Sequence, residues 1–153
     1  MNQNQEEKIL SYEYIRGLIE GEGCFTFTPV IVKGQKITSI PTFVIAMSAR
    51  DKELIEMVKQ TLGLRNKIYC YKAEFKKDGY KRQGRVILKV RDTGQLKNII
   101  VPLFYKRLAG NKGKQFSAWL EKIGNDPLVA KTYKFIYEIY KAGFYDRNPR
   151  FVD

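Results

Sequence analysis

The sequence contains no histidine in its 153 residues. This absence excludes catalytic triads that use a histidine base, nucleases that rely on an imidazole, and zinc sites with imidazole ligands. If the chain hydrolyses a bond, the chemistry must rest on carboxylates, lysines, backbone groups and a bound metal ion.

Cysteines and long apolar runs are also scarce. The two cysteines, Cys24 and Cys70, lie far apart and fit no zinc-binding spacing, so we expect reduced thiols. We therefore expect an intracellular protein, in the cytoplasm or nucleoid of a prokaryote or in an organelle. No apolar run is long enough to span a bilayer, and no basic amphipathic helix stands out, which predicts no membrane partner. Residues 1–8 are polar, and we expect a flexible tail without a secretion signal.

Acidic residues are outnumbered. The chain has 16 of them against 28 lysines and arginines, a formal net charge of +12, which favours a nucleic-acid partner. Residues 65–91 hold only two acids, Glu74 and Asp78. A solvated basic surface is the plainer alternative. The gathering of so many basic side chains on one predicted hairpin nevertheless favours binding of a nucleic acid. The basic side chains of this stretch are Arg65, Lys67, Lys72, Lys76, Lys77, Lys81, Arg82, Arg85, Lys89 and Arg91.

The periodicity of the apolar residues predicts one α+β domain over residues 1–153, in the order α-β-β-α-β-β-α-α-α. An α-β-β unit occurs twice, at about residues 11–47 and 51–91, so we expect one sheet with helices on one face and the other face open. We expect Pro102 to stop the third helix and Asp126-Pro127 to open the last one. The residues after Gly143 look irregular.

Alternation along the predicted strands sends a set of polar and basic side chains to the open face. A two-stranded ribbon fits the major groove of DNA, so these residues are candidates for contacts with DNA. The candidates are Thr26, Thr28, Thr38, Thr42, Val44, Tyr69, Tyr71, Arg82, Arg85, Lys89 and Arg91.

Two glycines and two acids stand where the first helix gives way to the first strand. Ser11 is a plausible N-cap, and the apolar stripe of this helix is Tyr14, Ile15, Leu18 and Ile19. Gly17 and Gly21 share one helix face, so they could allow a close helix–helix approach, or they could be a tolerated glycine and a C-cap. We place Glu22 just beyond the helix. Its carboxylate and the carbonyl of Gly21 are ligands that Mg²⁺ accepts, although surface carboxylates are common.

The stretch from Ile15 to Gly23 resembles the LAGLIDADG motif of homing endonucleases. The motif letters are kept at Gly17, Leu18, Ile19 and Gly23. Glutamates replace its two aspartates, at Glu20 and Glu22. Phe43-Val44-Ile45 and the helix that begins near Asp51 also look like the family, so the resemblance extends over nearly the whole chain.

The resemblance implies an αββαββα fold with a saddle-shaped antiparallel sheet that grips DNA, here followed by extra C-terminal helices. It implies a homodimer in which Gly17, Leu18 and Gly21 form the interface between two motif helices. Glu22, as the last acid of the motif, would bind Mg²⁺ or Mn²⁺. The dimer would cut both strands of a long pseudo-palindromic DNA site and leave 3′ overhangs.

Two basic residues complete the implied site. The stretch from Lys112 to Gln115 resembles the one that brings a basic residue to the active site, and on that match Lys114 would be catalytic, with Arg50 as a second basic residue. Such endonucleases are intron-encoded or intein-encoded and act in homing. The alternatives are a DNA- or RNA-binding protein on the same scaffold that does not cleave, such as an intron maturase or a regulator, and a basic ribosome-associated protein.

Overall fold

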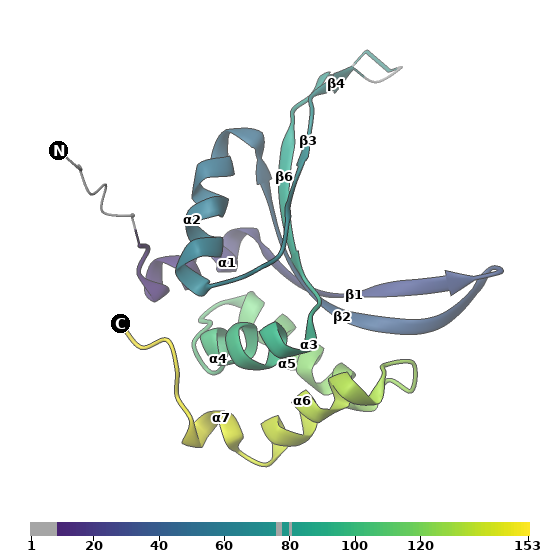
Figure 1. The fold of residues 1–153 in the computed structure, drawn as a ribbon, viewed down its shortest axis with the longest axis vertical. Helices are drawn as coiled ribbons and strands as arrows, with labels where there is room; N and C mark the ends of the chain where they lie inside the picture. Colours follow the sequence, from purple (N-terminus) through teal and green to yellow (C-terminus); the bar gives the residue numbers. More distant parts are fainter. Residues whose placement is uncertain (1–8, 76–77, 80) are drawn as a thin grey trace.

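A four-stranded antiparallel sheet organises the chain in the order β1-β2-β6-β3. The computed structural model describes residues 9–75, 78–79 and 81–153 (Figure 1). The expectation for residues 1–8 therefore lies outside the described residues. The strands are β1 (Gly23–Val32), β2 (Gln35–Ser48), β3 (Ile68–Tyr71) and β6 (Arg85–Val90), with a small second sheet of β4 (Glu74–Phe75) and β5 (Lys81–Arg82).

The helices cover one side of this sheet. In Figure 1 the hairpin of β1 and β2 extends sideways while β3 and β6 rise, so that the sheet bends into a saddle whose concave side carries no helix. The predicted fold class is thereby confirmed. The helical elements are α1 (Tyr12–Glu22), η1 (Ala49–Asp51), α2 (Lys52–Leu62), α3 (Thr93–Gln95), η2 (Leu96–Ile100), α4 (Val101–Phe104), α5 (Asn111–Asn125), α6 (Lys131–Lys141) and α7 (Phe144–Arg147). None of these helices is both long enough and apolar enough to cross a membrane.

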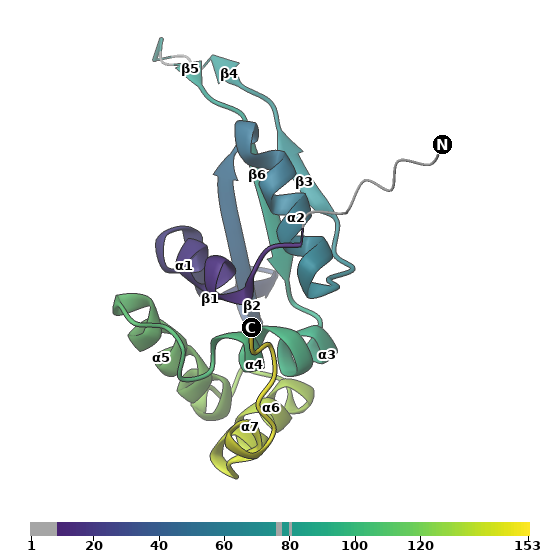
Figure 2. The same cartoon turned by 90° about the vertical axis from the view of Figure 1, so that its left-hand side faces the viewer.

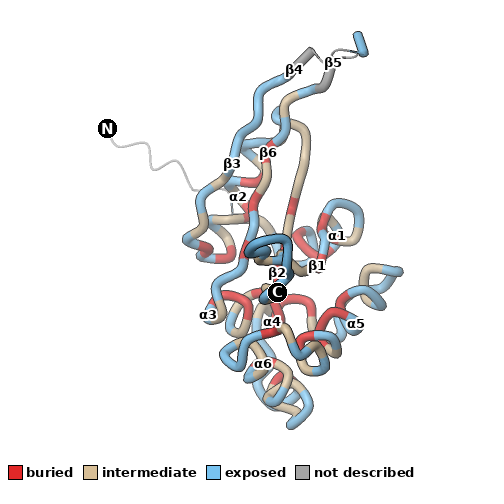
Figure 3. Tube along the Cα trace, turned by 90° about the vertical axis from the view of Figure 1, so that its right-hand side faces the viewer, coloured by how far each residue is buried: buried red, intermediate tan, exposed pale blue. Residues whose placement is uncertain are grey.

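The core lies between the sheet and the helices, where the buried segments of Figure 3 meet. Phe25 on β1 is its centre, with its ring centroid 5.0–5.5 Å from those of Phe43, Phe104, Phe116 and Trp119. Trp119 also donates a hydrogen bond of 2.8 Å to the carbonyl of Thr26. Rings from four elements thus fix α5 against β1 through burial and through edge and tilted ring contacts.

Helix α1 has a capping residue next to it in the sequence at each end, Ser11 and Gly23. The Ser11 hydroxyl accepts a hydrogen bond from the N–H of Tyr14, and Ile15 and Ile19 are fully buried. A Cβ added at Gly23 would collide with Cγ2 of Ile19, so only glycine fits where the helix turns into β1. The structure corrects two expectations: Glu22 is the last residue of the helix, and Tyr14 is half exposed rather than part of the buried stripe.

Pro102 does not stop the third helix. The helical path runs from Thr93 to Phe104 and passes through the π-helical turn η2, with Pro102 buried inside it. Proline has no N–H to donate, which leaves carbonyls one turn earlier in need of partners. The hydroxyl of Tyr145 donates to the carbonyl of Lys97, and the guanidinium of Arg150 donates to that of Asn98. Distant side chains therefore supply the donors that a proline-interrupted helix lacks.

The last helix begins later than expected. Asp126 closes a turn in which its carboxylate accepts from the N–H of Leu128, and α6 starts only at Lys131. The residues after Gly143 are not wholly irregular, because they form α7. The chain then returns toward the start of α1, as Figure 2 shows.

Candidate active site

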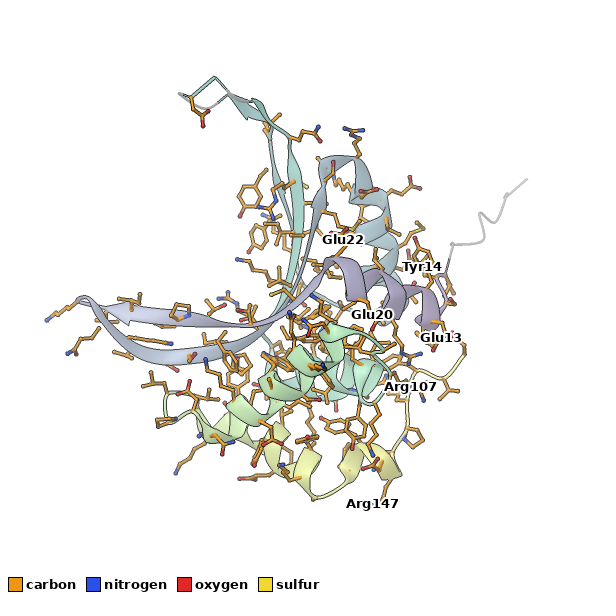
Figure 4. The ribbon with its side chains drawn as sticks, turned by 180° about the vertical axis from the view of Figure 1, so that it is seen from behind. Glu13, Tyr14, Glu20, Glu22, Arg107 and Arg147 are labelled. Atoms are coloured by element: carbon orange, nitrogen blue, oxygen red, sulfur yellow. The ribbon has the colours of Figure 1, made fainter. Side chains whose placement is uncertain are left out.

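The two acids of the motif face different surroundings. Glu20 Oε1 accepts a hydrogen bond of 2.7 Å from the N–H of Gly110, which is the N-cap residue of α5. Glu22, one position past Gly21, is exposed at the end of α1 where the chain enters β1 (Figure 4). Glu20 therefore joins two helices, whereas the carboxylate of Glu22 lies open to a ligand.

Lys112, to which the sequence analysis assigned no role, lies beside the motif. Its ammonium donates a hydrogen bond of 2.6 Å to the carbonyl of Gly23, the residue that follows Glu22. Lys114 lies on a different side of α5 and lines a hollow of about 610 Å³ together with Lys106 and Arg107. Residues two apart on a helix do not share a face. Lys112 is therefore the lysine that contacts the end of the motif, and the catalytic role of Lys114 stays a prediction.

Arg50 has a partner other than Glu22. It lies in η1 beyond the end of β2, and its guanidinium donates to Oε1 of Gln83 at 3.3 Å. Gly23, next to Glu22, pairs with Ile45, five positions earlier than Arg50 in the chain. The structure does not bring these two predicted site residues into contact.

The oxygen atoms at the end of α1 fit a hard divalent cation. The carboxylate of Glu22 and the carbonyl of Gly21 are the ligand types that Mg²⁺ and Mn²⁺ accept. Within the described residues, no three Asp, Glu, Cys or His side chains come together to hold a metal ion. The chain thus offers part of a coordination shell, and the remaining ligands would come from water, from a phosphate or from a second copy of the chain.

The open face carries aligned rows of side chains across the sheet. Cys24 on β1 pairs with Val44 on β2, and Val44 pairs with Lys89 on β6. Further along the sheet, Tyr71 pairs with Arg85, which pairs with Ser48. Each row has one member of the predicted DNA-contact set on β6, with its side chain exposed.

Tyrosines and cations at and next to β3 and β6 lie around one hollow. Tyr69, Tyr71, Lys89 and Arg91 line a shallow hollow of about 190 Å³ with Asn66 and Lys67. Tyr69 and Tyr71 are exposed, and the ammonium of Lys67 lies 5.6 Å from the ring centroid of Tyr69. A flat ring beside several cations suits a negatively charged partner with planar bases.

The four threonines predicted to contact DNA are less exposed than the tyrosines and cations of the open face. Thr42 is only 1% exposed, and its hydroxyl bonds to the carbonyl of Ile40 and to the hydroxyl of Thr28. The hydroxyl of Thr38 donates to the carbonyl of Leu128 in the helical layer. Thr26 and Thr28 remain half-buried on the open side. Thr42 and Thr38 are thus occupied inside the protein, while the side chain of Arg82 lies outside the described residues.

One face of α1 is largely uncovered by the described chain, although Leu18 on that face is half-buried against the core. Tyr14, Gly17, Leu18 and Gly21 follow one another at helical spacing, and Tyr14 is half exposed. A methyl group added at Gly17 or Gly21 would meet nothing within 4 Å. The described residues therefore give no packing reason for these glycines, although a helix-interior glycine costs about 1 kcal/mol relative to alanine.

Solved structures with the same fold bind DNA. I-SmaMI bound to cleaved DNA is 19% identical, with a TM-score of 0.60 over 93% of this chain and 46% of that one. I-GzeII in complex with its DNA target is 21% identical, with a TM-score of 0.58 over 92% and 47%. I-LtrWI bound to target DNA is 27% identical, with a TM-score of 0.58 over 86% and 43%. This chain spans less than half the length of each of these proteins.

A model of one protein family matches the chain over residues 15–123, from the motif helix to the buried end of α5. Its description is "LAGLIDADG endonuclease". The match contains the motif, the whole saddle and the lysine that contacts Gly23. The chain therefore belongs to the LAGLIDADG endonuclease family.

Proposed function

We propose that this protein is a site-specific, double-strand DNA endonuclease that acts as a homodimer with Mg²⁺ or Mn²⁺. The observation that supports this most is the position of Glu22. Its free carboxylate lies where an unpartnered helix face meets an open, basic sheet face. The solved relatives are about twice as long as this chain, so two copies would supply what one of those chains holds.

The open face would hold the DNA. Arg85, Lys89 and Arg91 are exposed on it and would neutralise phosphates or contact base edges, while Tyr69 and Tyr71 add apolar surface. Thr26, Thr28 and Val44 lie on the same side of β1 and β2, nearer to Glu22. Binding along both arms of the saddle would place the scissile phosphates beside the end of α1.

Glu22 and the carbonyl of Gly21 would hold the metal ion. When bound, a divalent ion polarises the phosphate and makes a bound water more acidic. Lys112 keeps a positive charge beside the same turn through its contact with Gly23, where it would offset charge that develops on the phosphate. Lys114 and Arg50 remain predicted basic contributors, with other neighbours in the monomer.

Pairing of two α1 helices would bring two copies of Glu22 together, one for each DNA strand. The stripe of Tyr14, Gly17, Leu18 and Gly21 would form this contact, since its glycines leave room for a second backbone. Such a dimer would recognise a pseudo-palindromic site and leave 3′ overhangs. An intron-encoded homing role would follow from that activity.

Cleavage of selected DNA tests the proposal. Duplexes that bind the protein are enriched from a randomised library and then incubated with the protein and Mg²⁺, or with EDTA. We expect metal-dependent double-strand cuts, whose ends are read by sequencing. Binding without cuts under any divalent metal would instead indicate a DNA- or RNA-binding protein on the same scaffold.

Glu22→Gln is the decisive variant. It keeps the side-chain shape but removes the charge, so we expect binding to persist and cutting to stop. Glu20→Gln is the matched control, because an amide oxygen can still accept the Gly110 N–H and cutting should continue. Equal cutting by the Glu22 variant and the unmodified protein would remove Glu22 from the site.

A further inference from the structure

The segment of residues 148–153 lies outside the family match and returns to the first turn of α1. Figures 1 and 4 show it leaving α7 and ending beside the start of the motif helix. The carboxylate of Asp153 accepts two hydrogen bonds of 2.8 Å, from the N–H groups of Tyr12 and Glu13. These are donors that the first turn of a helix cannot satisfy internally.

Arg16 ties the same segment to the motif helix from the other side. Its side chain is only 3% exposed, and each part of the guanidinium has a partner. Nε donates to the carbonyl of Leu103 at 2.7 Å, Nη2 to the carbonyl of Phe151 at 2.6 Å, and Nη1 to Glu13 at 2.6 Å. A buried cation with satisfied donors holds its neighbours in one arrangement, because losing a partner would leave a desolvated charge.

Ring contacts and the charges around Asp153 also hold residues 148–153 against the start of α1. The ring of Phe151 packs edge-on against that of Tyr12, with centroids 5.1 Å apart. The N–H groups of Tyr12 and Glu13, and then the charges of Arg16 and Arg107, hold the pKa of Asp153 below its ordinary value. A carboxylate at a helix N-terminus also interacts favourably with the helix dipole.

We propose that residues 148–153 form a strap that positions the motif helix for pairing with a second copy, and that Arg16 is its positioning residue. The inference rests on the proposed function, because it concerns the same helix face. Tyr14 begins the unpartnered stripe of α1, and the strap holds the backbone immediately before it. A fixed first turn presents Tyr14 and Gly17 already ordered, which lowers the ordering cost of association.

Asp153→Asn tests the strap without removing it. We expect faster amide hydrogen exchange at Tyr12 and Glu13, and a dimer dissociation constant about fivefold larger by sedimentation, the size of effect that one lost helix cap produces. Asp146→Asn is the matched control. Asp146 also accepts side-chain hydrogen bonds and has a lowered pKa, but its partners are Tyr105 and Lys106 rather than α1.

Arg16→Lys supplies a second variant that keeps the charge but cannot reach all three partners. It should weaken self-association in the same direction, and its folding is checked by thermal unfolding. Faster exchange with an unchanged dissociation constant would reduce the strap to a local cap and overturn the inference. Unchanged exchange would overturn it as well.

These measurements need neither DNA nor cleavage, so the two proposals can fail separately. A dimer that is weakened by Asp153→Asn but cuts no DNA would contradict the proposed function and support the strap. A chain that stays monomeric would contradict both. A cutting dimer that is indifferent to Asp153→Asn would contradict the strap alone.

Discussion

Lys112 and Lys114 are two positions apart on α5, and the helical rotation between them sends them to different neighbours. Lys112 reaches the carbonyl of Gly23 at the turn after Glu22, and Lys114 lines the hollow beside Arg107. A resemblance between short segments cannot separate two lysines that flank a single glycine. The contact with Gly23 assigns Lys112 to the candidate site.

Lys112→Met should therefore slow cleavage far more than Lys114→Met. Both changes remove one charge and keep an unbranched side chain. We expect the single-turnover rate at saturating metal to fall by about 10²-fold for Lys112→Met, the cost of losing one electrostatic donor at a reacting group. DNA affinity, measured separately by filter binding, should change little for either variant. A larger loss for Lys114→Met would reverse the assignment.

Among the elements, helix α1 has two faces with different surroundings. Ile15 and Ile19 bury one side in the core, and the stripe that contains Gly17 and Gly21 is left open on another. Gly23 ends the helix because no side chain fits against Ile19. The three glycines of the motif therefore differ. Gly23 is required because a side chain there would collide with Ile19, whereas no described atom lies close to Gly17 or Gly21.

Gly17→Leu separates folding from pairing. No described atom lies within 4 Å of a Cβ at this position, and leucine is a better helix former than glycine, so the monomer should unfold at the same or a higher temperature. Association should weaken by roughly tenfold to a hundredfold, because overpacking a close contact costs about 1–3 kcal/mol.

Sedimentation measures the dimer, and calorimetry measures the monomer. Glu53→Leu on the exposed side of α2 controls for added apolar surface. An unchanged dimer in the Gly17 variant would place the interface elsewhere.

For the whole molecule, the distribution of charge matters more than its total. The net charge is +12, and exposed lysines and arginines lie both on the open face and in the helical layer. On the saddle the cations stand beside tyrosines and on a surface that no helix covers, whereas Lys106 and Lys141 in the helical layer pair with Asp146 and Glu121. The free cations of the concave face are the ones available to a polyanion.

Arg85→Ala should weaken DNA binding and reduce by about one the slope of log affinity against log salt concentration. Arg147→Ala removes the same charge from α7, at the far end of Figure 4 from the saddle, and should leave the slope unchanged. Affinities over a series of salt concentrations provide the measurement. Equal slopes for the two variants would argue against the saddle as the DNA surface.

Most of the elements and the faces that they bury could be predicted from local patterns in the chain. Strand alternation placed Tyr69, Lys89 and Arg91 on the open side, where the structure has them, because burial repeats with the period of the backbone. The motif letters identified the family. Local patterns of this kind report which side of an element avoids water.

The contacts between residues far apart in the chain could not be predicted in this way and come from the folded structure. It placed Lys112 at Gly23, buried Thr42 among its strand neighbours, and let Pro102 remain within a helix by supplying Tyr145 and Arg150 as donors. It also joined the last residues to Tyr12, Glu13 and Arg16. Such contacts depend on how loops and packed layers close in space, and no periodicity in one segment records the partner that another segment will supply.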